Sequence, residues 1–124
     1  MGLDQYARAI KVESARKDED GYTVYDDQIS LVSWRKHPNL QGWMEHLWRS
    51  KGGEGEFNCV PVELNGDDLQ RLRIDVDHRD LPSTQGFFFG SDSDEYYKEQ
   101  DLTFVEEALE LIEAGYKIEY SSWW

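Results

Sequence analysis

The run Trp34-Arg35-Lys36 contains the residues best suited to hold a ligand. A guanidinium fork beside an aromatic plane can bind a carboxylate, a phosphate or a nucleic-acid base. In a chain with this many acidic residues, Arg35 could equally pair with a structural aspartate. The sequence leaves both interpretations open.

A second run, Gly86–Gly90, is densely aromatic. In a strand, alternation would send Phe87 and Phe89 to one face and Phe88 to the other. Core burial explains at least two of these rings, whereas an exposed phenylalanine would mark a ligand groove or a partner site. If the two runs converge in space, the expected binding residues are Trp34, Arg35, Lys36, Phe87, Phe88, Gly90, Ser91 and Tyr96.

Patterns for catalysis and metal binding are weak. The single cysteine, Cys59, could pair with His46 or His78, but a lone cysteine in an extended apolar segment is more often a small core residue. We expect that role for Cys59. The three histidines lack the spacing of a metal site, and we expect no metal and no cofactor. With 26 acidic residues, some carboxylates always lie close together, so the sequence leaves open whether the protein is an enzyme.

The charge balance points to a different kind of site. The 124 residues include 26 acidic and 13 basic ones, giving a net charge of -13. This composition argues against a membrane span, a disulfide framework and direct binding of nucleic acid, which needs clustered Lys and Arg. Carboxylates spaced along one helix could resemble a row of phosphates and attract a basic partner, although a solvated helix face is the usual explanation. The candidate residues are Glu106, Glu107, Glu110 and Glu113.

Three helices are predicted from apolar periodicity and from residues that start and stop helices. Pro38 suits a first helical turn, and Asn65 can cap a second helix. Gly115 suits the end of a third helix, in which we expect an apolar stripe of Leu102, Val105, Leu109 and Ile112. The predicted ranges are 38–50, 66–77 and 94–114, and the last helix could be continuous or broken near Gln100.

Short strands are predicted at both ends of the chain, over 3–12 and 116–120. A third run, 22–25, is β-prone, and 29–34 could be a strand or the approach to a helix. The charged stretch 13–21 is expected to be a solvated loop. Helices between terminal strands predict a single α+β domain over 1–124, with a short antiparallel sheet that includes both terminal strands and is packed by two to three helices.

Four segments together carry a family resemblance. The chain resembles a family of small uncharacterised proteins of tailed bacteriophages and prophages, which share a Gly-Leu-Asp-x-Tyr start, a Trp-Arg-Lys segment and a Gly-Phe-Phe-Phe-Gly-Ser block. The resemblance implies a phage-type origin and one domain, and it implies no reaction. The matching segments are 2–6, 33–36, 81–91 and 120–123.

The leading hypothesis is a non-enzymatic module that binds a basic host macromolecule, such as a nucleic-acid-handling or defence protein. The alternative is a small-molecule binding protein or minor enzyme with a pocket near Trp34-Arg35-Lys36 and Phe87–Gly90. A structural virion component is a third possibility.

The start of the chain lacks the features of a signal peptide, so we expect a cytoplasmic protein, in the host if phage-encoded. It could be a monomer or a homodimer, and an exposed Trp or Phe would favour the homodimer. Trp123 and Trp124 are either docked on the domain or available to a partner.

Overall fold

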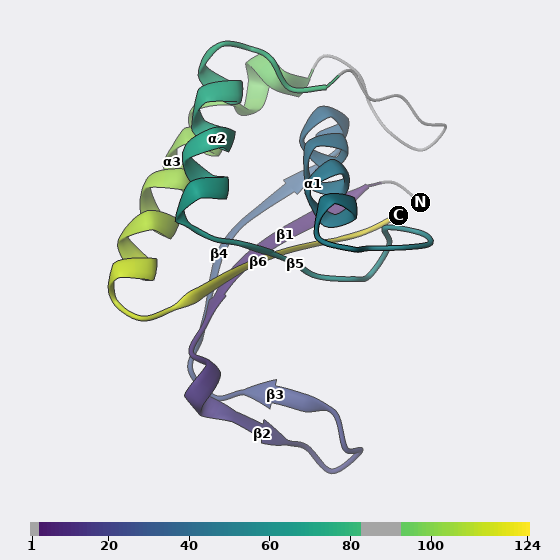
Figure 1. Cartoon of the computed structure of the whole chain (residues 1–124), viewed down its shortest axis with the longest axis vertical. Helices are drawn as coiled ribbons and strands as arrows, with labels where there is room; N and C mark the ends of the chain where they lie inside the picture. The colour runs from purple at the N-terminus through teal and green to yellow at the C-terminus, as the bar shows by residue number, and fades with distance from the viewer. Residues whose placement is uncertain (1–2, 83–92) are drawn as a thin grey trace.

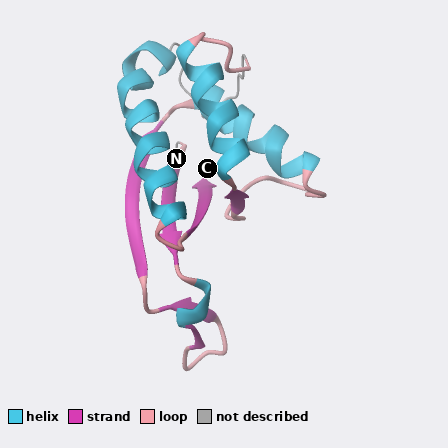
Figure 2. Cartoon of the chain, turned by 60° about the vertical axis from the view of Figure 1, so that its left-hand side comes forward, coloured by secondary structure: helices cyan, strands magenta, loops and turns pink. Residues whose placement is uncertain are grey.

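A computed structural model describes residues 3–82 and 93–124, with residues 93–95 described by their backbone alone. It has the predicted α+β architecture, in which α1, α2 and α3 pack on one face of a four-stranded antiparallel sheet (Figures 1 and 2). The elements are β1 (Asp4–Ile10), a 3-10 turn η1 (Val12–Ser14), β2 (Ala15–Lys17), β3 (Thr23–Tyr25), β4 (Gln28–Arg35), α1 (Pro38–Ser50), β5 (Val62–Leu64), α2 (Gly66–Asp77), α3 (Ser93–Glu113) and β6 (Lys117–Trp123).

The two terminal strands are neighbours in the sheet, as predicted. The strand order is β4-β1-β6-β5, and β1 pairs with β6 from Asp4 opposite Trp123 to Ile10 opposite Lys117. On its other side β1 pairs with β4, and a bulge interrupts the register between Ala7 and Arg8. The start of β1 and the end of β6 therefore lie side by side (Figure 1).

Helices α1 and α2 have the bounds that the sequence predicts. Pro38 occupies the first turn of α1. At the start of α2, the Asn65 side chain accepts the Asp68 backbone N–H, while the Asp68 carboxylate accepts the Asn65 backbone N–H. This reciprocal capping satisfies two amides that would otherwise lack partners at the helix end.

Of the two alternatives for α3, the structure has the continuous helix, which runs unbroken through Gln100. The predicted apolar stripe needs a correction. The deepest residues of the helix are Phe104, Val105 and Ala108. The predicted stripe members Leu102, Leu109 and Ile112 are only partly buried at the margin of the core. The buried face is thus rotated from the predicted one.

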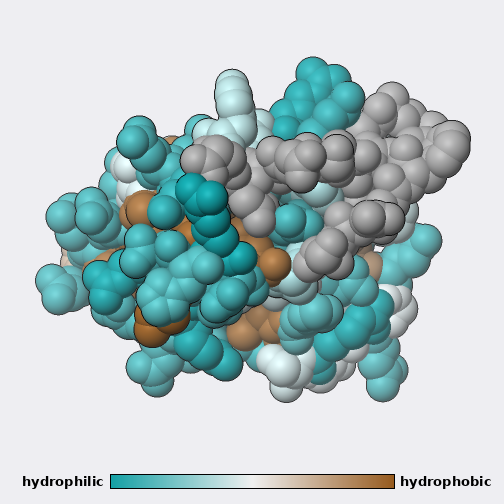
Figure 3. Space-filling view, turned by 90° about the horizontal axis from the view of Figure 1, so that it is seen from above, coloured by the Kyte–Doolittle hydropathy of each residue, from teal (hydrophilic) through white to brown (hydrophobic). Residues whose placement is uncertain are grey.

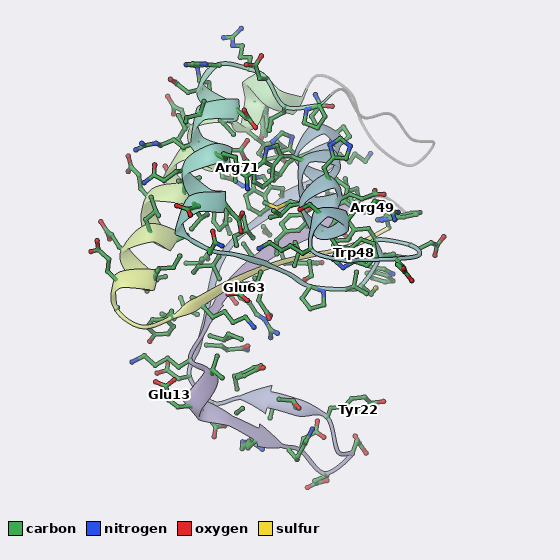
Figure 4. The ribbon with its side chains drawn as sticks, in the orientation of Figure 1. Glu13, Tyr22, Trp48, Arg49, Glu63 and Arg71 are labelled. Carbon is green, nitrogen blue, oxygen red and sulfur yellow. The ribbon has the colours of Figure 1, made fainter. Side chains whose placement is uncertain are left out.

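The stretch 13–21 is also more ordered than the expected solvated loop. Residues 15–17 form β2, which pairs with β3 to make a hairpin that projects from the body of the domain (Figure 1). Its turn is held by the Asp18 carboxylate, which accepts the backbone N–H groups of Asp20 and Tyr22. Tyr22 is 71% exposed and lies near the tip of this hairpin (Figure 4). The segment 29–34 is a strand, part of β4.

The core lies between the sheet and the helices. It includes Leu40, Met44, Leu69, Leu72 and Ile118, all of them fully excluded from solvent. Cys59 is not in it, contrary to expectation: the residue is exposed and has a positive φ of 60°. Its backbone N–H donates to the Ser122 carbonyl, so β6 fixes the backbone of this segment while the thiol faces outward. Among the described helices, none is long and apolar enough to cross a membrane.

Candidate functional site

A buried polar cluster lies between β4, α1 and α3. His37 Nε2 lies 2.8 Å from Asp101 Oδ2, and Trp34 Nε1 donates to Asp101 Oδ1 at 2.7 Å. The ring of Tyr97 stacks on His37 with centroids 5.0 Å apart. Because buried polar groups are costly without partners, this cluster specifies how the start of α1 sits against α3.

A second buried network fixes the turn between β4 and α1. Gln5 accepts the His37 backbone N–H and donates to the His37 carbonyl, so one amide side chain satisfies both backbone groups. Gln5 also donates to the Tyr120 hydroxyl, which in turn donates to Gln41 at 2.6 Å. Burial is the largest effect on the Tyr120 phenol and raises its pKa far above the ordinary value, although the hydrogen bond from Gln5 opposes this rise. The Asp101 charge adds a smaller increase to the pKa. The phenol is therefore a neutral structural group.

The first half of α3 protects the edge of the sheet. The Tyr97 hydroxyl accepts the Arg35 backbone N–H and donates to the Arg35 carbonyl. Gln100 donates to the Ser33 carbonyl at 2.8 Å. These bonds occupy backbone groups on β4 that would otherwise be open to another strand.

A surface hollow of about 400 Å³ lies beside this protected edge. Arg35 borders it with a side chain that is 74% exposed, and its only described ion pair is a loose one, 3.9 Å from Asp4. The guanidinium donates no hydrogen bond to any described residue, so its planar fork is available to a carboxylate. We call this site the Arg35 hollow; its lining residues are Asp4, Tyr6, Ser33, Trp34, Arg35, Tyr96, Tyr97 and Gln100.

The structure brings together three of the binding residues named from the sequence, Trp34, Arg35 and Tyr96. Their roles differ: the Trp34 ring is only 2% exposed and forms part of the wall, whereas Tyr96 is 82% exposed. Lys36 is exposed next to the hollow, in a backbone conformation with φ of 58°. The remaining residues of that prediction lie outside the described part of the chain, namely Phe87, Phe88, Gly90 and Ser91.

The exposed side of α3 forms an acidic surface, which extends at Glu106 into a hollow that Arg73 and Ile74 of α2 also line. Glu106, Glu107, Glu110 and Glu113 are all exposed, and none of them forms an ion pair or hydrogen bond with a described residue. We call this surface the α3 acidic face. Seen from above, the molecule is mostly hydrophilic, with apolar residues in small areas between hydrophilic ones (Figure 3).

Another hollow, of about 350 Å³, separates α1 from α2. Its walls include the exposed His46, and Arg71, which projects from α2 (Figure 4). Trp43 Nε1 donates to Asp75 across the gap. In residues 3–82 and 96–124, no cluster of three or more His, Cys, Asp or Glu side chains could hold a metal ion.

Sequence reasoning missed the central pair of the buried cluster, His37 and Asp101. One signal was available in the sequence. Asp101 precedes Phe104, Val105 and Ala108 at helical spacing, so its carboxylate lies on the same helix face as three apolar residues. Such a residue needs a buried partner, but the sequence does not identify which one.

Comparison with protein-family models, curated proteins and solved structures finds no match to this chain. The resemblance to the phage protein family therefore stays a prediction from sequence segments. The function has to be inferred from the geometry and charge of the molecular surface.

Proposed function

We propose that this protein is a binding module whose α3 acidic face docks on a basic surface of a macromolecular partner. The observation that carries the proposal is the exposure of four carboxylates on neighbouring turns of α3 without a described cationic partner. The family resemblance suggests that the partner is a host protein, with nucleic-acid-handling and defence proteins as the leading classes, and that the meeting takes place in the host cytoplasm.

The placement of these carboxylates opposes helix stability, which supports a role in binding. Glu110 and Glu113 lie at the carboxyl end of α3, where the helix dipole favours positive charge, and the last turn contains no basic residue. Glu106 and Glu110 are also four residues apart, a spacing at which like charges repel. A surface selected for stability alone would carry Lys or Arg at these positions.

Charge steers association even where it adds little affinity, so the attraction should depend on salt. A labelled oligolysine peptide is a suitable probe, with binding followed by fluorescence anisotropy at low and at physiological salt. Replacing Glu106, Glu107, Glu110 and Glu113 with Gln should weaken binding about tenfold or more, the scale of roughly 1.4 kcal/mol.

A matched control separates a local site from the overall negative charge. The exposed residues Glu19, Asp20, Glu54 and Glu56 lie between β2 and β3 or between α1 and β5, and they can be replaced with Gln or Asn, which removes the same number of charges. We expect this control variant to bind nearly as well as the parent protein. Equal weakening of both variants would contradict the proposal, since it would make the attraction a property of total charge.

A second candidate function, binding of a small ligand, is supported by the Arg35 hollow. An uncommitted guanidinium beside tyrosine rings fits an aromatic monocarboxylate, while the neighbouring Asp4 disfavours a dianion such as phosphate. Benzoate is a simple probe, and its binding can be followed by amide chemical shifts in an NMR titration.

For this second function, Arg35→Ala should abolish the benzoate-induced shifts around Gln100 and Tyr97 with little loss of thermal stability, because Arg35 is exposed. The exposed Arg73, on α2, provides the control Arg73→Ala, which should leave the shifts intact. Shifts that survive Arg35→Ala, or unfolding of that variant, would reject the assignment.

A further inference from the structure

The sheet has one face without helices, which we call the open face. It is covered at one end, where Ile10 is 0% exposed and Arg8 lies 5.7 Å from the centre of the Tyr25 ring of β3. Along β1, Gln5, Ala7 and Ala9 are buried under the helices, so the alternate residues Asp4, Tyr6 and Arg8 point the other way. The same alternation on β6 turns Glu119, Ser121 and Trp123 outward beside them. Three ladders of paired residues connect β4, β1, β6 and β5 across this face.

Aromatic rings on the open face are only half covered. Trp123 is 62% exposed and Tyr6 is 47% exposed. Trp123 lies opposite Asp4, and Ser121 lies opposite Tyr6, so the two rings occupy diagonal positions on adjacent strands, close enough for aromatic side chains to meet. Exposed aromatic residues gathered on one surface are typical of an interface.

The two consecutive tryptophans have different roles. Trp124 is docked, because its backbone N–H donates to the Asn58 side chain and its indole donates to the Phe57 carbonyl. Asn58 also donates to the Trp124 carbonyl, which fixes the end of β6. Trp123 is therefore held in place by its neighbour and presented to solvent.

The charge balance of the open face indicates which partner can bind there. Its cations Arg8, Arg35 and Lys117 are matched in number by its anions Asp4, Glu63 and Glu119, whereas the whole chain has a net charge of -13. Two copies of so acidic a chain repel each other over most of their surfaces, but not over a neutral one. We infer that the open face pairs with the open face of a second copy of this chain, forming a symmetric homodimer.

The strand register gives this pairing a specific geometry. The two-fold axis would lie between the two sheets, parallel to the strands and midway between β1 and β6. It would set β1 of each copy against β6 of the other. Arg8, which contacts Glu119 at 2.8 Å within one chain, then also faces Glu119 of the second copy. Packed sheets align to within about 30°, which keeps these rows facing each other.

The size of the face predicts a weak and reversible dimer. Strands β4, β1 and β6 are seven or eight residues long, and β5 has three residues. At about 3.4 Å per residue and about 4.8 Å between strands, they cover roughly 400 Å² per copy, or about 800 Å² in total. Stable interfaces bury about 1,200–2,000 Å². We expect a dissociation constant in the range of roughly 10–500 µM, so sedimentation velocity over about 5 µM to 1 mM should span the transition.

The aromatic pair supplies the first test. Trp123→Ser should shift the monomer–dimer transition at least tenfold to higher concentration, while Tyr22→Ser, on the projecting hairpin, should leave it unchanged. Thermal melting at low concentration checks that each variant folds. A parent protein that stays monomeric up to about 1 mM would overturn the inference. So would a dimer that Trp123→Ser does not weaken, because it would use another face.

A charge-swap experiment tests the geometry itself. Arg8→Glu and Glu119→Arg should each abolish self-association, since each variant faces like charges across the two-fold axis. An equimolar mixture of the two variants should restore dimers, which no repair within one chain could do. Failure of the mixture to dimerise, in variants that remain folded, would exclude this arrangement.

Discussion

His37 Nε2 and Asp101 Oδ2 lie 2.8 Å apart although 64 residues separate them in the chain, and their side chains are 0% and 1% exposed. This contact joins the start of α1 to the middle of α3. The second Asp101 oxygen accepts the Trp34 indole N–H from β4. One carboxylate thus ties two helices and a sheet strand together behind the Arg35 hollow.

Removing this carboxylate should be strongly destabilising. Asp101→Ala leaves the ring nitrogen of His37 and the Trp34 N–H buried without their acceptor, and we expect a loss of about 3–5 kcal/mol in the free energy of unfolding, measured with urea. Asp101→Asn keeps one acceptor oxygen and should cost about 1–3 kcal/mol. The exposed Asp77 gives the control Asp77→Ala, expected within about 0.5 kcal/mol of the parent. Equal losses in Asp101→Ala and Asp77→Ala would contradict the role of the buried pair.

Tyr120 should make the protein sensitive to alkali. Burial raises the pKa of its phenol in the folded state, so the neutral form is kept where the unfolded chain loses its proton. The contribution of the neutral phenol to the free energy of unfolding is complete below pH about 10. Above that pH it is lost by about 1.4 kcal/mol per pH unit. Urea unfolding at pH about 9 to 11 should show a shallower decline for Tyr120→Phe than for the exposed control Tyr22→Phe. Identical slopes in the two variants would show that the buried phenol titrates normally.

Gly53 should not tolerate a side chain. A methyl group there would overlap the Trp48 indole, which is itself packed on Phe57 with ring centroids 5.1 Å apart. We expect Gly53→Ala to cost about 1–3 kcal/mol, as overpacking does. Gly66→Ala is the control, because a methyl group at Gly66 meets no atom within 4 Å and should change stability by less than about 1 kcal/mol, in the stabilising direction. Chemical denaturation of both variants measures the difference, and a neutral Gly53→Ala would mean that Trp48 moves freely.

The carboxylates of the α3 acidic face should lower the free energy of unfolding of the protein. Glu113→Lys places a positive charge at the carboxyl end of α3 and removes repulsion with Glu110, so we expect a gain of about 0.5–1 kcal/mol in the free energy of unfolding. Glu99→Lys, in the first half of the helix, should give a smaller gain. Both can be measured by thermal or urea unfolding at low salt. A loss of stability in Glu113→Lys would mean that this carboxylate has a structural partner.

Much of the architecture follows from local signals. Pro38 and Asn65 begin α1 and α2 at the predicted residues because their preferences act within one helical turn. The α+β class and the inclusion of both terminal strands also follow from the order of the predicted elements. Strand β3 lies within the predicted β-prone run 22–25. Its partner β2 was missed because 15–17 is exposed throughout and contains no alternation of apolar and polar residues.

The candidate site was harder to predict because it depends on contacts across the chain. The structure places Trp34, Arg35 and Tyr96 at one hollow, but the sequence did not show that the Trp34 ring is buried against Asp101. The exposure of Cys59 was equally hidden, since it depends on a bond between its backbone and β6.

The sequence by itself determined the net charge, the helix ends and the positions of the outer carboxylates of α3, because composition, capping and periodicity are local properties. Only the tertiary structure decided that Asp101 meets His37, that Trp124 is docked while Trp123 faces solvent, and that one face of the sheet is both open and neutral. Those outcomes depend on which strands become neighbours and in which register. Strand pairing joins segments that are distant in the sequence. It is stabilised by the apolar surface that all of these segments bury together.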